Sequence, residues 1–466
     1  MLTSVNIPDS VTSIGSYAFE KCGNMTSINI PDSVISIGEG AFCSTGLTDI
    51  VIPNGVTTID DGVFCECYQL TNVTIPESVT SIGTCAFDTC EILASINIPE
   101  GVTSIGASAF RCCEALTSIN IPEGVTVIGD STFDGCISLT EINIPDGVTS
   151  IGALAFNYCE ALTSINIPEG VTNIGEKTFN RCISLTDVVI PNGVTSIGNY
   201  AFGECGNMTS INIPESVISI GEYVFQYCYD LADISIPASI GTITANTFRN
   251  SYLVNVTISD GITSIEDYAF YNCSNLASIN IPDSVINIGD YAFSGTKSMA
   301  TVNFGSGVQQ IGAHAFDNCA ITSAVLPNSV TSIGEYAFNY CFAMTSVYIP
   351  GSIAKISNYA LYNCGSLRDV NIGDGVSELG SWIFSGSSLV EITLPASITT
   401  VGTDVFYYCR SLKTVTVLSV IPPSGSSRIF NSTSALSNIR VPAESVDAYK
   451  AAAGWKDYKS CIKAIA

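Results

Sequence analysis

A short internal repeat constrains the fold of this 466-residue chain more than any other feature of its sequence. A phenylalanine recurs about every 23 residues from Phe19 to Phe430, with Leu361 in its place once, so that the chain contains 19 units. The unit that begins at Leu162 reads Leu-Thr-Ser-Ile-Asn-Ile-Pro-Glu-Gly-Val-Thr-Asn-Ile-Gly-Glu-Lys-Thr-Phe-Asn-Arg-Cys. One such unit cannot bury its own Leu, Ile, Val and Phe, whereas stacked units can bury them as continuous ladders of like residues.

Each unit divides into three segments. The segment Leu-x-x-Ile-x-Ile alternates branched apolar residues with Ser, Thr and Asn, which predicts a strand with one buried face. Proline ends this strand, and the following Val-x-x-Ile-Gly predicts a second short extended piece, whose glycine we expect to adopt a backbone angle that other residues resist. The last segment, Ala-Phe-x-x-Cys, predicts a tight helical or 3₁₀-like turn that directs the phenylalanine inward.

This pattern resembles the leucine-rich repeat, and specifically its BspA-like subclass, whose units read Leu-x-x-Ile-x-Ile-Pro-x-x-Val-x-x-Ile-Gly-x-x-Ala-Phe-x-x-Cys. The resemblance covers residues 2 to about 418 as full units. It implies a leucine-rich-repeat solenoid with parallel β-strands on a concave face and short extended and helical or 3₁₀ turns on the convex side. Residues 1–418 are therefore assigned to a solenoid of 22–23-residue units.

The C-terminal segment differs from the repeats in both pattern and charge. The formal charge is −29 up to residue 418 and +3 over residues 419–466. We assign this segment to a last partial unit and a C-terminal cap with a short helix that ends at Gly454, as similar tails close BspA-like proteins. An independent basic binding tail is the alternative, but Trp455 and Tyr458 favour packing.

The N-terminal end has neither a cap nor a hydrophobic targeting segment before the first unit at Leu2. The chain is expected either to begin inside a longer protein or to be a complete intracellular protein with an exposed first coil. Because an exposed strand edge promotes aggregation, truncation is the favoured expectation.

The composition excludes several classes of function. There are 16 Lys and Arg against 42 Asp and Glu, a net charge of −26, which disfavours nucleic acids and anionic membrane surfaces as partners. Every apolar run is far shorter than the roughly 20 residues that span a bilayer, so no membrane insertion is expected. The single histidine, His314, lies at a variable position of the repeat, where a surface residue is expected. With so little acid–base chemistry available, we expect no enzyme, no cofactor and no metal site.

The 19 cysteines are explained by the repeat rather than by disulfides or zinc. Fourteen of them follow the repeat phenylalanine by three residues, and Ser or Thr replaces them in other units. Stacked equivalents would lie about 4.8 Å apart with parallel side chains, which predicts buried free thiols that act as small apolar groups. The five remaining cysteines lack zinc-site spacing, and the sequence leaves open whether any of them is bridged: Cys43, Cys65, Cys85, Cys112 and Cys461.

Candidate binding residues are sought on the outward positions of the first strand, where most units carry Ser and Asn. The departures are Asp49, Val51, Glu141, Asp187, Val189, Asp233, Val325, Tyr348, Asp369 and Glu391, with Arg368 and Lys413 one position upstream. Acidic, Val and Tyr side chains together are able to form a protein-binding patch, although neutral drift of the repeat would also produce such departures. Our candidate concave-face residues are Asp187, Val189, Asp233, Tyr348, Arg368, Asp369 and Glu391.

Two classes of function follow. BspA-like proteins resemble surface adhesins of oral and gut bacteria and of protist parasites, which bind host matrix proteins or host cells. The resemblance therefore implies an extracellular or cell-surface recognition scaffold. Because the outward strand positions between residues 231 and 417 depart most from the Ser/Asn pattern, we expect a protein or glycan ligand to be held on the concave face in the C-terminal half. The alternative is an intracellular or structural protein-interaction scaffold without a host target, which the free thiols permit.

Overall fold

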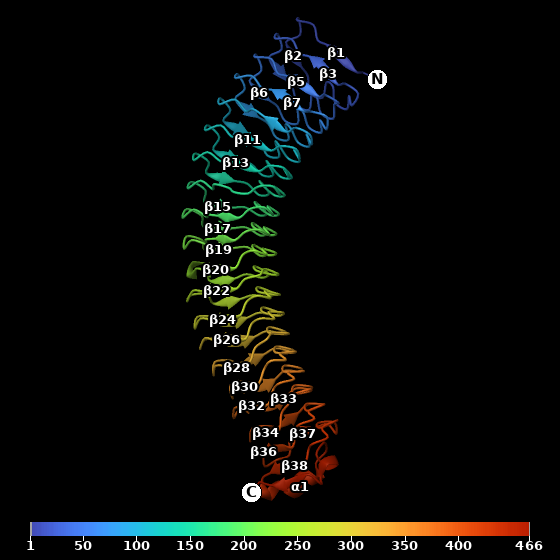
Figure 1. The fold of residues 1–466 in the computed structure, drawn as a ribbon, viewed down its shortest axis with the longest axis vertical. Helices are drawn as coiled ribbons and strands as arrows, with labels where there is room; N and C mark the ends of the chain where they lie inside the picture. Colours follow the sequence, from blue (N-terminus) through green and yellow to red (C-terminus); the bar gives the residue numbers. More distant parts are fainter. Residues whose placement is uncertain (1, 466) are drawn as a thin grey trace. The chain divides into compact units, whose positions relative to one another are not determined.

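The computed structural model describes residues 2–465, which form 39 short strands and very little helix. Residues up to Leu231 form one compact unit, here the N-terminal unit, and those from Ala232 onward form a second, the C-terminal unit. Within each unit, successive coils follow one another in chain order, and equivalent strands of neighbouring coils pair in parallel (Figure 1). The leucine-rich-repeat solenoid expected from the sequence is therefore confirmed.

In the N-terminal unit the strands belong to two ladders. The first ladder comes from the Leu-x-x-Ile-x-Ile segments and contains β1 (Ser4–Asn6), β3 (Ser27–Asn29), β5 (Asp49–Val51), β7 (Asn72–Thr74), β9 (Ser95–Ile96), β11 (Ser118–Asn120), β13 (Glu141–Asn143), β16 (Asp187–Val188) and β18 (Ser210–Ile211). The second comes from the Val-x-x-Ile segments and contains β2 (Ser13–Ile14), β4 (Ser36–Ile37), β6 (Thr58–Ile59), β8 (Ser81–Ile82), β10 (Ser104–Ile105), β12 (Val127–Ile128), β14 (Ser150–Ile151), β15 (Asn173–Ile174), β17 (Ser196–Ile197) and β19 (Ser219–Ile220).

The C-terminal unit repeats this arrangement. Its first ladder contains β20 (Asp233–Ile236), β22 (Asn255–Ile258), β24 (Ser278–Asn280), β26 (Thr301–Asn303), β28 (Ser323–Val325), β30 (Ser346–Ile349), β32 (Asp369–Ile372), β34 (Glu391–Leu394), β36 (Thr414–Val417), β38 (Asn438–Val441) and β39 (Ile462–Ala464). Its second contains β21 (Thr242–Ile243), β23 (Ser264–Ile265), β25 (Asn287–Ile288), β27 (Gln310–Ile311), β29 (Ser332–Ile333), β31 (Lys355–Ile356), β33 (Glu378–Leu379), β35 (Thr400–Val401) and β37 (Ser424–Gly425). A 3₁₀ helix, η1 (Ala238–Ile240), precedes β21.

The core of each unit is a set of ladders of identical residues. In the N-terminal unit, rings from Phe19 to Phe225 stack in an unbroken column with centroids 5.4–5.8 Å apart and nearly parallel planes. In the C-terminal unit, Leu361 interrupts the column but is itself buried. The repeated Leu, Ile and Val side chains are also buried, as the alternation of the sequence predicts.

The turn that carries the phenylalanine differs from a 3₁₀ helix in its backbone angles. Its residues make the expected hydrogen bonds to the third residue before them, for example from the Cys182 N–H to the Phe179 carbonyl at 3.2 Å. However, the residues two before and two after the phenylalanine have positive φ in nearly every coil, such as Tyr200 at 57° and Glu204 at 59°. These left-handed residues interrupt helical geometry and let the turn pair with the next coil: the Tyr200 N–H donates to the Glu222 carbonyl at 2.9 Å.

The glycine that follows the second strand does not have the unusual backbone angle predicted for it. None of the glycines that directly follow a strand of the second ladder, from Gly15 after β2 to Gly402 after β35, is among the residues with positive φ. Glycine is needed there because neighbouring coils approach closely: a Cβ added to Gly106 would lie 2.4 Å from the Thr84 nitrogen. The prediction was therefore wrong about the cause, since the constraint comes from the preceding coil and not from the glycine's own φ.

The cysteine column is a hydrogen-bonded ladder as well as a packing element. The Cys205 thiol donates to the Phe179 carbonyl one coil earlier at 3.1 Å, and the same contact recurs at nearly every ladder cysteine. In the last coil, Thr433 makes the equivalent bond to the Phe406 carbonyl at 2.8 Å. The position therefore requires a short side chain with a donor, which explains why Ser and Thr replace Cys there.

We expect reducing agents to leave the unfolding midpoint of the protein unchanged, because all 19 cysteines are free in the structure. Alkylation in denaturant followed by intact-mass measurement should modify all of them. Without denaturant the ladder should react slowly, because burial raises the pKa of the Cys205 thiol to about 12 and so suppresses its thiolate. Recovery of six or seven stable bridges would contradict this prediction.

The single histidine is part of an aromatic stack on the turns of the C-terminal unit. His314 lies between the rings of Tyr291 and Tyr336, with centroids 4.4 and 4.6 Å away, and its Nδ1 is 3.0 Å from Asp317 Oδ2. The side chain is half-buried in this stack, at the surface position that the sequence predicts. The repeat spacing that stacks the core phenylalanines also stacks the rings two positions before them.

The last coil is followed by a short helical segment, made of η2 (Ala443–Ser445), α1 (Val446–Ala451) and η3 (Lys456–Tyr458). The buried Trp455 packs edge-on against Phe430 and donates from Nε1 to the Pro423 carbonyl at 2.8 Å. Strand β39 then pairs in parallel with β38. Between residues 2 and 465, every helix is too short to cross a membrane.

Candidate functional site on the first strand ladder

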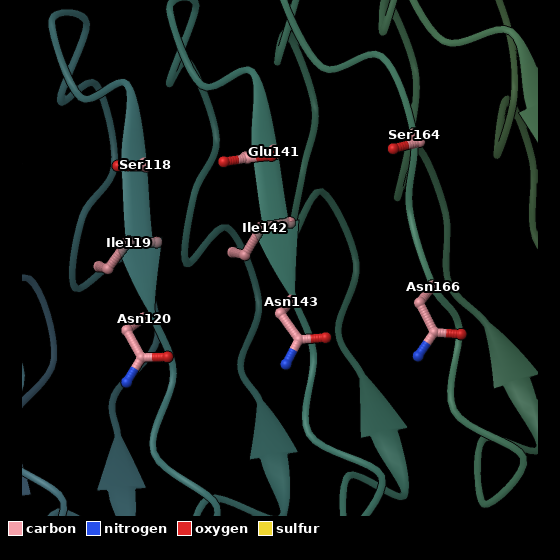
Figure 2. A pocket seen from close by; sticks show the side chains of 8 residues that line it. All are labelled: Ser118, Ile119, Asn120, Glu141, Ile142, Asn143, Ser164 and Asn166. Carbon is pink, nitrogen blue, oxygen red and sulfur yellow. The ribbon is translucent and has the colours of Figure 1, made fainter.

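The outward face of the first ladder carries two columns of small polar side chains. In the N-terminal unit, Asn120, Asn143 and Asn166 form one column, and Ser118, Glu141 and Ser164 form the other (Figure 2). Their register is exact in the paired strands, where Ser118 lies opposite Glu141 and Asn120 opposite Asn143. They line a shallow hollow of about 530 Å³. The outward direction assigned to these positions from the sequence is confirmed by their exposure.

Two of the candidate residues, Asp187 and Val189, lie on this face of the N-terminal unit. Val189 is 72% exposed. Asp187 accepts hydrogen bonds from the hydroxyls of Ser210 at 2.7 Å and Thr209 at 3.2 Å, and the Ser210 bond lowers the pKa of its carboxyl. Asp187 is therefore partly engaged by its own neighbours in the next coil.

Asp233 lies alone at the start of the C-terminal unit. It accepts a hydrogen bond from the Asn255 side-chain amide at 2.6 Å. Four strands of the first ladder separate β20 from β30, which at about 4.8 Å per strand places Asp233 roughly 24 Å from Tyr348. Asp233 does not join the other candidates of its unit.

The remaining candidates lie on adjacent strands. Arg368, Asp369 and Glu391 line a hollow of about 670 Å³ over β32, β34, β36 and β38. Tyr348 lies opposite Asn371, which lines the same hollow, and is half-buried with its hydroxyl 3.4 Å from Asn328 Oδ1. The structure thus brings four of the seven candidate residues to one place.

Two charged residues at this hollow were missed in the sequence. Asp374 follows β32, and Arg440 lies on β38 in the outward column that contains Tyr348. The signal for Arg440 was present, because Asn438-Ile-Arg-Val continues the strand pattern beyond the last full unit. Extending the outward column by one more coil would have included it.

The charges around the hollow are available to a ligand. Among the ion pairs formed between residues 2 and 465, none includes Arg368, Asp369, Asp374, Glu391 or Arg440. Each of these side chains is exposed. The hollow therefore presents both signs of charge without internal neutralisation, a condition for steering and selecting a complementary surface.

An apolar groove adjoins the charged hollow, and Leu418 lines both. The groove has a volume of about 390 Å³ and contains Val420 and Ile421, which are 55% and 78% exposed. Exposed apolar surface next to unpaired charges is typical of protein-binding sites. Sequence reasoning missed this groove because residues 418–423 lie after the last regular strand of the repeat.

One protein family matches the chain along nearly its whole length. The family model for the BspA type leucine rich repeat region (6 copies) matches residues 1–116, 103–232, 149–277, 218–345, 263–391 and 331–453. A comparison with curated protein sequences returned no match.

Several proteins of known structure are similar to this chain. A leucine rich cell surface protein from Faecalibacterium prausnitzii is 30% identical over 70% of this chain and 87% of that chain, with a TM-score of 0.42. A leucine-rich repeat protein from Bacteroides ovatus is 24% identical over 99% of this chain and 92% of that chain, with a TM-score of 0.35. The T. pallidum leucine rich repeat protein is 33% identical over 40% of this chain and 78% of that chain, with a TM-score of 0.32. Because the family model matches nearly the whole chain, the protein belongs to the BspA-type leucine-rich repeat family.

Proposed function

We propose that this protein is a non-enzymatic recognition scaffold at the cell surface that binds a host or matrix protein, or a glycan, on the first ladder of its C-terminal unit. Membership of the BspA-type family supports an interaction role and a surface location. The observation that carries the proposal is the hollow at Arg368, Asp369 and Glu391, where unpaired charges of both signs adjoin exposed apolar side chains. Such a combination supplies contact area and selectivity together.

The scaffold itself favours binding over chemistry. The outward side chains of a strand ladder vary without disturbing the buried ladders behind them, so recognition evolves independently of the fold. The proposed role for the hollow is therefore to hold a surface rather than to transform a substrate.

Replacing Tyr348 and Asp369 by alanine is expected to weaken binding by about 1 kcal/mol or more, if Tyr348 anchors the ligand. The measurement is surface plasmon resonance against immobilised matrix proteins and against glycans. The matched control replaces Asn120 and Glu141, which hold the equivalent outward positions in the N-terminal unit. If the control loses binding while the Tyr348→Ala/Asp369→Ala protein keeps it, the assignment to the C-terminal unit is wrong.

The alternative function is an intracellular or structural interaction scaffold without a host target. The free cysteine ladder favours it, since unbridged thiols are typical of reducing compartments. Immunolabelling of intact cells distinguishes the two locations: surface labelling supports the first proposal, and labelling only after permeabilisation supports the alternative.

A further inference from the structure

A second hollow lies on the turns of the N-terminal unit, away from the strand face proposed above. It has a volume of about 570 Å³ and is lined by residues two, four and five positions after the phenylalanine of three successive coils: Arg181, Ile183, Glu204, Gly206, Asn207, Tyr227 and Tyr229. The hollow exists because Gly206 has no side chain at the position where the flanking coils carry Ile183 and Tyr229. This position is therefore a gap in the column of side chains.

The walls of this hollow are apolar and exposed. Tyr229 is 44% exposed and Ile183 is 43% exposed. The Tyr229 ring leans toward the gap, since a Cβ added to Gly206 would lie 3.6 Å from its Cδ2 atom. Tyr227 packs beside it with ring centroids 6.1 Å apart and planes inclined by 56°. The Tyr229 side chain thus offers an aromatic surface to a ligand seated over Gly206.

The polar groups of the hollow are held in place and carry no net charge. Arg181 Nε donates to Glu204 Oε2 at 2.8 Å, and its guanidinium lies over the Tyr158 ring, 4.8 Å from the centroid. This pair positions the terminal amino groups of Arg181 as donors and leaves Glu204 Oε1 as an acceptor. Asn207 adds an exposed amide with both a donor and an acceptor.

These properties select one chemical class of ligand. An anion would face Glu204, and a cation would face Arg181, so neither sign of charge is favoured within the hollow. A purely apolar ligand would leave the donors and acceptors at the rim without partners. A pyranose ring has an apolar C–H face for Tyr229 and adjacent hydroxyls that both donate and accept hydrogen bonds, as Arg181, Glu204 and Asn207 require.

We propose that the hollow at Gly206 is a binding subsite for a neutral saccharide, which stacks on Tyr229 and hydrogen-bonds to the Arg181–Glu204 pair. The net charge of −26 further disfavours sialylated and sulfated glycans at long range. This subsite lies on turns and is independent of the ligand proposed for the first ladder.

The test is a printed array of neutral, sialylated and sulfated oligosaccharides, followed by calorimetry with the neutral oligosaccharide that gives the strongest signal. Tyr229→Ala is expected to lower the affinity at least tenfold, and Glu204→Gln at least threefold. Gly206→Val fills the gap and should abolish binding, while circular dichroism verifies that each variant remains folded. Gly206 has no positive φ, and an added Cβ meets only the Tyr229 ring, so the fold should accept this change.

Tyr68→Ala is the matched control, because Tyr68 follows its coil's phenylalanine by four residues, as Tyr229 does, and is 42% exposed. Its acidic neighbours are Glu66, Asp88 and Glu91, and Tyr68 does not line the hollow at Gly206, so its loss should leave saccharide binding unchanged. The Tyr348→Ala/Asp369→Ala protein should also bind the saccharide normally, which separates this proposal from the preceding one. The proposal is overturned if no neutral glycan binds, if only acidic glycans bind, or if Tyr229→Ala and Gly206→Val bind as the unchanged protein does.

Discussion

Replacing Phe202 by alanine is expected to lower the free energy of unfolding by about 3–5 kcal/mol. The ring is fully buried and stacks between Phe179 at 5.4 Å and Phe225 at 5.8 Å. Its loss leaves a cavity that the neighbouring coils cannot close, because the backbone hydrogen bonds of both strand ladders hold their spacing. Urea denaturation followed by circular dichroism measures the change.

The first coil provides the control for this variant. Within the described part of the chain, Phe19 stacks on one ring only, that of Phe42, and is half-buried. Phe19→Ala should therefore cost clearly less than Phe202→Ala. A loss below about 1 kcal/mol at Phe202 would contradict its role in the column.

Replacing Gly106 by alanine is expected to cost about 2–3 kcal/mol, although only a methyl group is added. The new Cβ would lie 2.4 Å from the Thr84 nitrogen and 2.5 Å from the Gly83 carbonyl carbon, both of which are backbone atoms that no side-chain rotation can move away. Relief requires a local separation of two coils, which weakens their hydrogen bonds, such as that from the Gly106 N–H to the Ile82 carbonyl at 2.9 Å. Thermal and urea unfolding measure the loss.

Gly15 is a matched control within the same chain. It follows the second strand of the first described coil, as Gly106 follows that of a later coil, but a Cβ added there meets no atom within 4 Å. Gly15→Ala should therefore be neutral or slightly stabilising, because alanine restricts the unfolded chain. Equal losses at both positions would show that the glycine is needed for its own backbone angle, as the sequence first suggested, and not for the approach of the coils.

The ladders of the core were predictable from the sequence because each ladder depends on one residue type that recurs at the same position of almost every unit. A residue that recurs with the coil, such as Phe202 or Cys205, must stack on its equivalents if the units stack at all. The same reasoning assigns inward and outward directions on the first strand, since side chains alternate along it, and it correctly placed Ser118 and Asn120 outside. Periodicity alone therefore determined the fold and the set of surface positions.

Which of those surface positions act together was decided only by the tertiary structure. Asp233 and Asp369 hold the same position in the repeat, yet Asp233 is bonded to Asn255 whereas Asp369 borders a hollow. The charged hollow also depends on Arg440, which lies beyond the last full unit, and the saccharide subsite depends on the missing side chain of Gly206 between two exposed neighbours. Such features arise from contacts between coils, and a pattern read along one coil does not contain them.

The backbone shows the same division between sequence and structure. The sequence shows that glycine recurs at the repeat position of Gly106. The reason for it is structural, because a Cβ atom there would collide with the Thr84 nitrogen of the preceding coil. The left-handed angles at Tyr200 and Glu204 were not visible, because ordinary side chains occupy them and the hydrogen bonds to the next coil stabilise them. The sequence by itself determined the repeat and its buried ladders, whereas the spacing between coils decided where glycine is obligatory, which thiols donate hydrogen bonds and where a ligand finds room.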